Sequence, residues 1–66
     1  MIYLNKLSGE KIMINCDMIE LVTENPDTVI LMENGHSYIV EESMDEILAL
    51  IKEYKRSLKR SRLDRD

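Results

Sequence analysis

Few residues of this 66-residue chain could carry out chemistry, and the most reactive types occur once each. Cys16 is the only cysteine and His36 the only histidine. One Cys–His pair is therefore the sole candidate for a nucleophile with its general base, and neither an intrachain disulfide nor a Cys/His zinc cluster can form. Structural roles are sufficient for both residues, because His36 follows a hairpin signal, Asn34-Gly35, and Cys16 falls in a predicted turn.

Other catalytic and cofactor-binding patterns are also weak. Glu41 and Glu42 are adjacent carboxylates, but they point to opposite faces of an extended strand, and acids at a strand-to-helix junction are usually solvated or favour the helix N-terminus. Gly9 and Gly35 are the only glycines, so the chain has no glycine-rich phosphate loop. We therefore predict that the protein is not an enzyme, binds no cofactor, metal or small-molecule substrate, and works by contacting other proteins.

Charge is divided unevenly along the chain. Residues 1–51 contain two basic and ten acidic residues, a net charge of −8, whereas residues 52–66 contain seven basic and three acidic residues, a net charge of +4. The acidic part would repel a nucleic-acid backbone, so nucleic acid is not the expected partner. The basic part could contact an acidic protein surface or, peripherally, anionic lipid, or it could only keep the chain in solution. The residues predicted to bind a partner are Lys52, Lys55, Arg56, Lys59 and Arg60.

Turn signals divide residues 1–41 into five short segments that are rich in β-branched and apolar residues. These signals are Ser8-Gly9, Asn15-Cys16-Asp17, Asn25-Pro26-Asp27 and Asn34-Gly35, of which the last favours a two-residue turn with positive φ at both positions. The fold class that follows is mainly β with a C-terminal helix, with the strands forming a five-stranded antiparallel meander or a small barrel. The predicted strands cover residues 2–7, 11–15, 19–24, 28–33 and 37–41.

The hydrophobic period changes after residue 43, which predicts a helix over residues 44–60. Ser43 and Glu46 match a capping box, in which each side chain accepts a hydrogen bond from the backbone of the other. Residues 61–66 hold a single apolar anchor and are predicted to be a frayed tail, so residues 1–60 form one domain. A stripe at three- and four-residue spacing is expected to cover one face of the sheet; it consists of Met44, Ile47, Leu48, Leu50, Ile51, Tyr54 and Leu58.

The core of such a short chain must be small, and folds of this size usually need a disulfide, a metal or a partner subunit. The fourth strand is apolar on both faces, with Val29 and Leu31 on one and Ile30 and Met32 on the other. One helix covers only one face, so we predict a homo-oligomer or a docked partner. The chain has no Phe and no Trp, so its methionines are expected to fill the core.

Several segments together resemble the FlbD family of small flagellar proteins, which has SwrD-like swarming members. They are MIYLNKLSG at residues 1–9, INCDMIE at 14–20, NPDTVI at 25–30, NGHSYIV at 34–40 and EES at 41–43. The resemblance implies a non-catalytic accessory protein of bacterial flagellar motility that supports motor power through the stator. It also implies a cytoplasmic location, with the inner face of the cell membrane near the motor as a further site. Where the family favours Thr-Arg, this chain has Asn5-Lys6.

Residues 1–14 are also similar to the start of the CsrA family of RNA-binding regulators, through Leu4, Gly9 and Ile12-Met13-Ile14. That likeness implies intertwined dimers of five-stranded chains with a C-terminal helix, and an alternative function in post-transcriptional regulation. The CsrA family uses an arginine near position 6 and a basic residue just before the helix, whereas this chain has Lys6 and then Glu41-Glu42-Ser43. Acids at this edge would repel phosphate.

Overall fold

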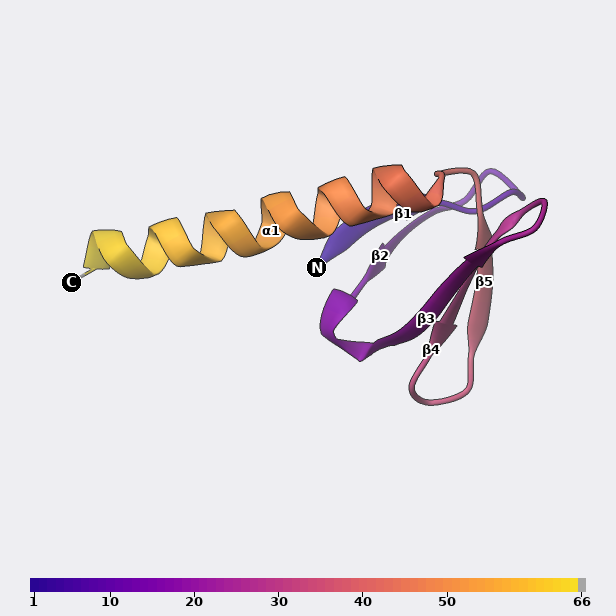
Figure 1. The fold of residues 1–66 in the computed structure, drawn as a ribbon, viewed down its shortest axis with the longest axis horizontal. Helices are drawn as coiled ribbons and strands as arrows, with labels where there is room; N and C mark the ends of the chain where they lie inside the picture. The colour runs from indigo at the N-terminus through magenta and orange to yellow at the C-terminus, as the bar shows by residue number, and fades with distance from the viewer. Residues whose placement is uncertain (66) are drawn as a thin grey trace.

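The computed structural model describes the backbone of residues 1–65 and the side chains of residues 1–58. It has five strands in two antiparallel sheets and one long helix (Figure 1), so the prediction of a mainly β fold with a C-terminal helix is confirmed. The elements in chain order are β1 (Ile2–Asn5), β2 (Lys11–Ile14), the 3-10 helix η1 (Cys16–Met18), β3 (Ile19–Glu24), β4 (Thr28–Met32), β5 (Ser37–Val40) and α1 (Met44–Arg65).

Two of the hairpins turn in the same way. In the β1–β2 turn, the Gly9 N–H donates to the Lys6 carbonyl at 2.8 Å, and in the β4–β5 turn the Gly35 N–H donates to the Met32 carbonyl at 3.0 Å. Both glycines have positive φ, +98° and +93°, a conformation that L residues with a side chain rarely adopt. The prediction of a two-residue turn with positive φ at Asn34 is wrong. Of these two residues only Gly35 adopts positive φ, and the loop between β4 and β5 has more than two residues.

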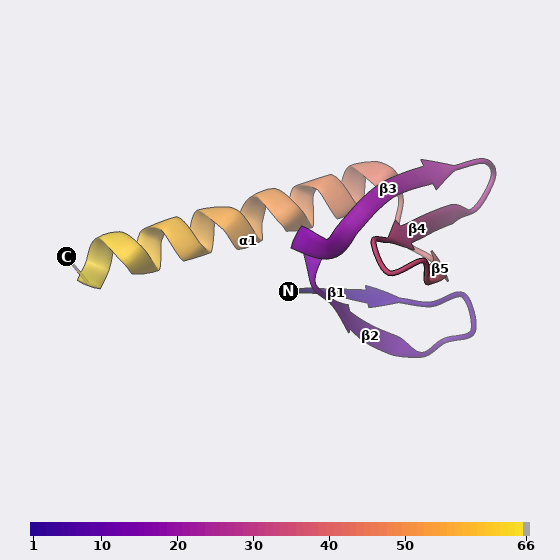
Figure 2. The ribbon, with the colours of Figure 1, turned by 90° about the horizontal axis from the view of Figure 1, so that it is seen from below.

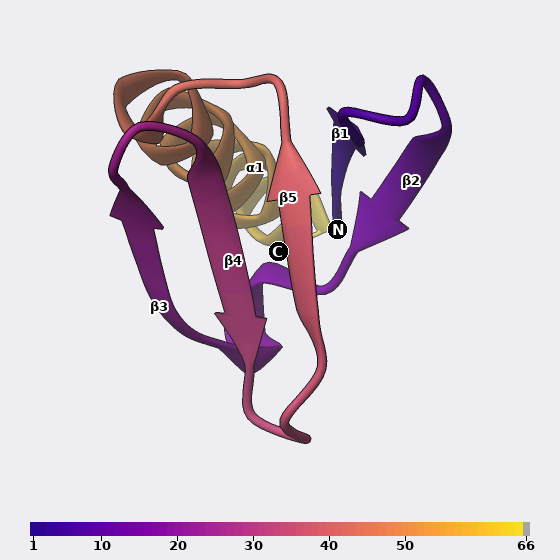
Figure 3. The ribbon, with the colours of Figure 1, turned by 90° about the vertical axis from the view of Figure 1, so that its right-hand side faces the viewer.

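The two sheets meet but do not close on each other. One sheet holds β1 and β2, and the other has the order β3-β4-β5. A single bridge, Lys6 with Val40, joins them, and beside it the Leu7 N–H donates to the Ile39 carbonyl at 3.1 Å. The expectation of a single meander or small barrel is wrong, because η1 redirects the chain and β2 and β3 are not paired in the described structure (Figure 3).

The helix covers the open side between the two sheets. Ile47 is buried, and Ile51 and Tyr54 pack partly buried against the core. The predicted apolar stripe is therefore narrower than expected, because its other members are on the surface: Met44, Leu48, Leu50 and Leu58. The core itself consists of Ile2, Leu4, Ile14, Cys16, Ile30, Met32, Val40 and Ile47.

Most methionines lie on the surface rather than in the core. Met32 is buried as predicted, but Met1, Met13, Met18 and Met44 are exposed, so the general prediction of core methionines is wrong. Strand parity explains one case, because Met13 pairs with exposed Tyr3 on the outward side of the β1–β2 hairpin. The exposed thioethers add flexible apolar surface, which suits contacts with other proteins.

Side chains from both sheets fix the start of α1. The capping box is confirmed, since the Glu46 N–H donates to Ser43 Oγ at 3.2 Å and the Ser43 N–H donates to Glu46 Oε1 at 3.0 Å. Glu24, at the end of β3, accepts from the Met44 N–H at 3.0 Å. Just before the helix, Glu42 accepts from β1 residue Asn5. These contacts determine where α1 leaves the sheets.

The helix is longer than the body that it covers. Its 22 residues correspond to about 33 Å at 1.5 Å per residue, and the molecule measures 43 × 21 × 19 Å. The second half of α1 extends past both sheets (Figures 1 and 2). Its backbone continues to Arg65, past the predicted end at residue 60, because neither Gly nor Pro follows Ser43 to stop it. Fraying of residues 61–66 stays a prediction.

Candidate protein-binding surface

The exposed basic side of α1 is the surface that the sequence predicted to bind a partner. Lys52, Lys55 and Arg56 are all exposed, and their three- and four-residue spacing places them on one side of the helix. Lys59 and Arg60, the other two predicted residues, have side chains outside the described part of the structure. We call Lys52, Lys55 and Arg56 the basic flank.

Intramolecular contacts leave most of the charge on the basic flank available. Arg56 Nη1 lies 3.3 Å from Glu53 Oε2, and both side chains are largely exposed, so this pair contributes about 0–1 kcal/mol and is easily exchanged for another. Among the described side chains, neither Lys52 nor Lys55 forms a salt bridge.

An apolar cleft lies between β3 and α1, next to the basic flank. It has a volume of about 210 Å³ and is lined by Val22 from β3 and by five residues of α1, of which Asp45 is the only charged one; the others are Met44, Ile47, Leu48 and Ile51. Leu48 precedes Lys52 by four residues and Ile51 precedes Lys55 by four, so each pair lies one turn apart on the same side of the helix. The cleft and the basic flank therefore form one strip, apolar towards the start of α1 and basic further along. We call it the α1 strip.

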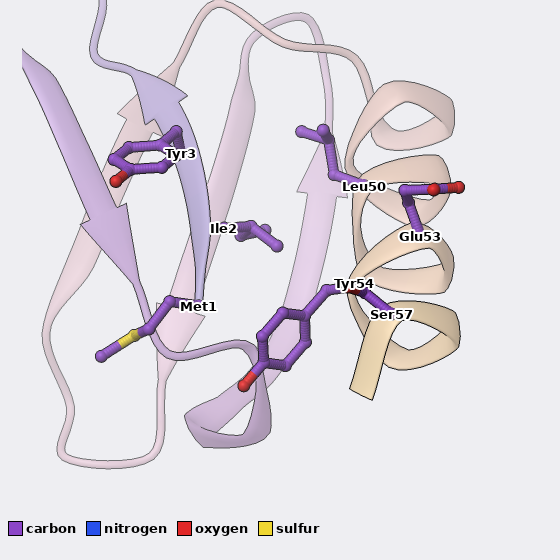
Figure 4. A pocket seen from close by; sticks show the side chains of 7 residues that line it. All are labelled: Met1, Ile2, Tyr3, Leu50, Glu53, Tyr54 and Ser57. Carbon is purple, nitrogen blue, oxygen red and sulfur yellow. The ribbon is translucent and has the colours of Figure 1, made fainter. Parts of the chain in front are cut away.

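A second groove lies on the other side of the helix, between α1 and β1 (Figure 4). Met1, Tyr3, Leu50 and Tyr54 contribute to its apolar lining, and its volume is about 330 Å³. An adjoining pocket of about 560 Å³ shares Tyr3 and Leu50 and is bordered by acidic residues; these are Glu42, Glu46 and Glu53. This groove could not be predicted from the sequence because it depends on how β1 and α1 pack. Its only sequence signal was Leu50, which widens the helix stripe.

Glu42 holds β1 to the start of α1. Both of its carboxylate oxygens lie 3.1 Å from the Asn5 backbone nitrogen, and the Asn5 side-chain amide donates to Oε2 at 2.8 Å. Partial burial raises the pKa of the Glu42 carboxyl, but the hydrogen bonds from Asn5 and from the Glu42 backbone N–H outweigh that effect, so the pKa lies below its ordinary value. Glu42 is therefore charged at neutral pH and keeps this edge of the molecule negative.

The reactive residue types do not form a site. Cys16 is buried in η1, and His36 is exposed beside the β4–β5 turn. The described residues contain no group of three or more His, Cys, Asp or Glu side chains that could hold a metal ion. Asn15 explains the local structure at Cys16, because its side chain accepts from the Asp17 N–H at 3.0 Å and caps η1.

No helix within residues 1–65 combines the length and the apolar character that crossing a membrane requires. In comparisons with known proteins, the family model FlbD, described as flagellar and swarming motility proteins, matches residues 1–59. No curated protein and no solved structure gives a significant match. The matched range includes both sheets and the part of α1 that holds the basic flank.

Proposed function

The chain belongs to the FlbD family of flagellar and swarming motility proteins, and from this membership we propose that it is a non-catalytic accessory protein of the flagellar motor. In this proposal it supports motor power or stator function by binding a motor or stator protein. It acts in the cytoplasm, close to the inner face of the cell membrane where the motor is anchored.

The α1 strip is the proposed contact surface. The observation that carries this assignment is the position of the basic flank, on a helix that overhangs the acidic body and directly beside an apolar cleft. A partner that fits would be an amphipathic segment, with an apolar side chain for the cleft and acidic side chains for Lys52 and Lys55. Burial of an apolar anchor would supply most of the affinity, and the charges would supply orientation and association rate.

The residues directly before α1 suit a protein partner better than they suit RNA. The likeness to RNA-binding regulators would need a basic residue just before the helix, and this chain has Glu42 there. Hydrogen bonds from Asn5 keep that carboxylate charged, and a fixed negative charge repels phosphate.

The test is a double charge reversal on the basic flank, Lys52→Glu with Lys55→Glu. Each exposed charge pair contributes about 0–1 kcal/mol, so one substitution would have little effect, whereas reversing two would turn attraction into repulsion. The matched control is Lys6→Glu with Lys11→Glu, which produces the same net charge from positions on the body. Circular dichroism first checks that both variants fold.

Two readouts then follow in motile cells: the swarming rate, and the stator proteins and RNA recovered with the tagged protein. We expect the flank variant to lose swarming and stator recovery while the control keeps both. Normal swarming in the folded flank variant would exclude the α1 strip as the contact surface. Recovery of RNA in place of stator proteins would favour the regulator alternative.

A further inference from the structure

The outer face of the β3-β4-β5 sheet is apolar and has no covering element. The inner face packs on the core through Ile30 and Met32 of β4, so alternation places Val29 and Leu31 on the opposite side. The strand register adds neighbours to each, forming two rows of three residues. The rows are Leu21, Leu31 and Ser37, and Thr23, Val29 and Ile39. We call these six positions the sheet face.

The sheet face holds no charged residue, although 33% of the chain is charged. Leu21 is 45% exposed and Ile39 is 46% exposed, so its apolar corners are open to water. The other two corners are the small hydroxyl residues Thr23 and Ser37. The acid that follows Thr23, Glu24, caps the helix through the Met44 N–H.

We propose that the sheet face binds a second copy of this chain. In a two-fold symmetric pair, each subunit presents the same patch to the other, so a charged residue on the patch faces residues of the same charge across the interface. The basic flank and the acidic groove beside β1 would both repel themselves in such a pair. The six positions of the sheet face carry no charge, and exposed acids lie beyond the strand ends, Asp27 and Glu33 on either side of β4 and Glu41 after β5, where they would stay at the rim of the contact.

The geometry suits face-to-face packing of two sheets, which lie about 10 Å apart when apolar side chains fill the space between them. Leu31 and Val29 lie on the central strand β4 and would occupy the middle of the interface, with Leu21 and Ile39 to either side. Past β5 the surface becomes mixed, because Leu7 and Ile39 line a shallow pocket of about 350 Å³ together with Lys6 and Ser8. The pairing would cover the second face of a chain whose own core is small.

The experiment compares two variants of the full chain by sedimentation velocity between 1 and 100 µM, about the range in which moderate dimers dissociate. The face variant is Leu21→Lys with Ile39→Lys. The control is Met13→Lys with Met18→Lys, which replaces two exposed methionines outside the sheet face and the α1 strip, 54% and 44% exposed. Both variants change the net charge from −4 to −2, so a difference between them cannot come from overall repulsion. Circular dichroism verifies that each is folded.

We expect the wild type and the control to sediment as dimers of the 7.8 kDa chain. The dissociation constant of the face variant should rise about 100-fold or more, because each subunit would bury two lysine charges without partners. A wild type that stays monomeric at 100 µM would overturn the proposal. So would a folded face variant that stays dimeric, or a control that dissociates as readily as the face variant, since either result would place the contact elsewhere.

Discussion

Glu42→Gln tests how α1 is held against β1. Glutamine keeps the size of the side chain but removes its charge and replaces one acceptor oxygen with an NH₂ group, which faces the Asn5 donors. The Asn5 backbone N–H and side-chain amide, at 3.1 Å and 2.8 Å from the carboxylate, then share a single acceptor. The substitution thus weakens the hydrogen bonds without creating a cavity.

The magnitude follows from the bonds that are lost. A hydrogen bond to a charged group contributes about 1.5–3 kcal/mol when it is shielded from water, and the partial exposure of Glu42 reduces that value. One bond is retained by the glutamine oxygen. We therefore expect the free energy of unfolding to fall by about 1–2 kcal/mol, which lowers the melting temperature of a domain of this size by about 7–14 °C.

Urea denaturation at one protein concentration measures this change, with Glu41→Gln as the control. Glu41 is the neighbouring acid and is exposed, so its neutralisation changes the net charge equally but removes no hydrogen bond described for its side chain. The pH dependence has a definite sign. Because folding lowers the pKa of Glu42, its stabilisation is fully present above the ordinary value of 4.5 and is lost as pH falls through the lower folded value.

Two results would refute this account of Glu42. The first is a Glu42→Gln protein as stable at pH 7 as the Glu41→Gln protein, which would mean that the bonds to Asn5 contribute nothing net. The second is a stability difference between wild type and Glu42→Gln that is as large at pH 3 as at pH 7, because a bond that depends on the carboxylate charge must weaken when the carboxyl takes up a proton.

Two further predictions concern the helix cap and the reactive residues. Ser43→Ala should lower the free energy of unfolding by about 1 kcal/mol, because the Glu46 N–H loses its acceptor; unchanged urea denaturation would show that water replaces the cap without loss. Cys16→Ala combined with His36→Asn should leave swarming normal, because one residue is buried and the other exposed beside a turn; loss of swarming in a folded double variant would contradict a non-catalytic role.

Much of the fold was predictable because its signals are local. Ser43 and Glu46 lie three residues apart and make the reciprocal bonds that the capping box predicts. Gly9 and Gly35 mark two hairpins because few other residues accept positive φ. The β3 range, residues 19–24, agrees with the strand observed, although an irregularity between Ile19 and Leu21 interrupts the expected alternation of its side chains.

The errors arose where the outcome depends on how the elements pack. Periodicity made Met44 and Leu48 part of the helix stripe, but α1 inserts between two sheets and buries only a narrow line of side chains through Ile47. Alternation could not decide which side of the β1–β2 hairpin faces the core, so Met13 was placed wrongly. The predicted barrel does not form because η1 separates β2 from β3. The prediction was wrong because a three-residue helix has a weak sequence signal.

The candidate site also has one part that the sequence could predict and one part that it could not. The cations of the basic flank are visible in the sequence because charge can be counted, and their exposure was expected at the end of an amphipathic helix. The apolar half of the α1 strip was not visible, since Val22 and Leu48 lie 26 residues apart and share a cleft only through the packing of β3 against α1. The charge pattern of the sequence thus suggested the proposed surface, and the tertiary structure added the apolar cleft that would anchor a partner.

The two proposed contacts, through the sheet face and through the α1 strip, can exist together because they use different elements and because one surface is uncharged while the other is basic. A surface that pairs with itself must avoid charge, as the sheet face does, whereas a surface that selects a different protein benefits from charge of one sign, as the basic flank does. The sheet face lies on the side of β4 away from the core, while the α1 strip runs along the helix that covers the core. Pairing through the sheet face would therefore leave both helices free and present two α1 strips from one particle. Two weak contacts on one particle bind a target far more tightly than either does alone when the target presents the same segment twice.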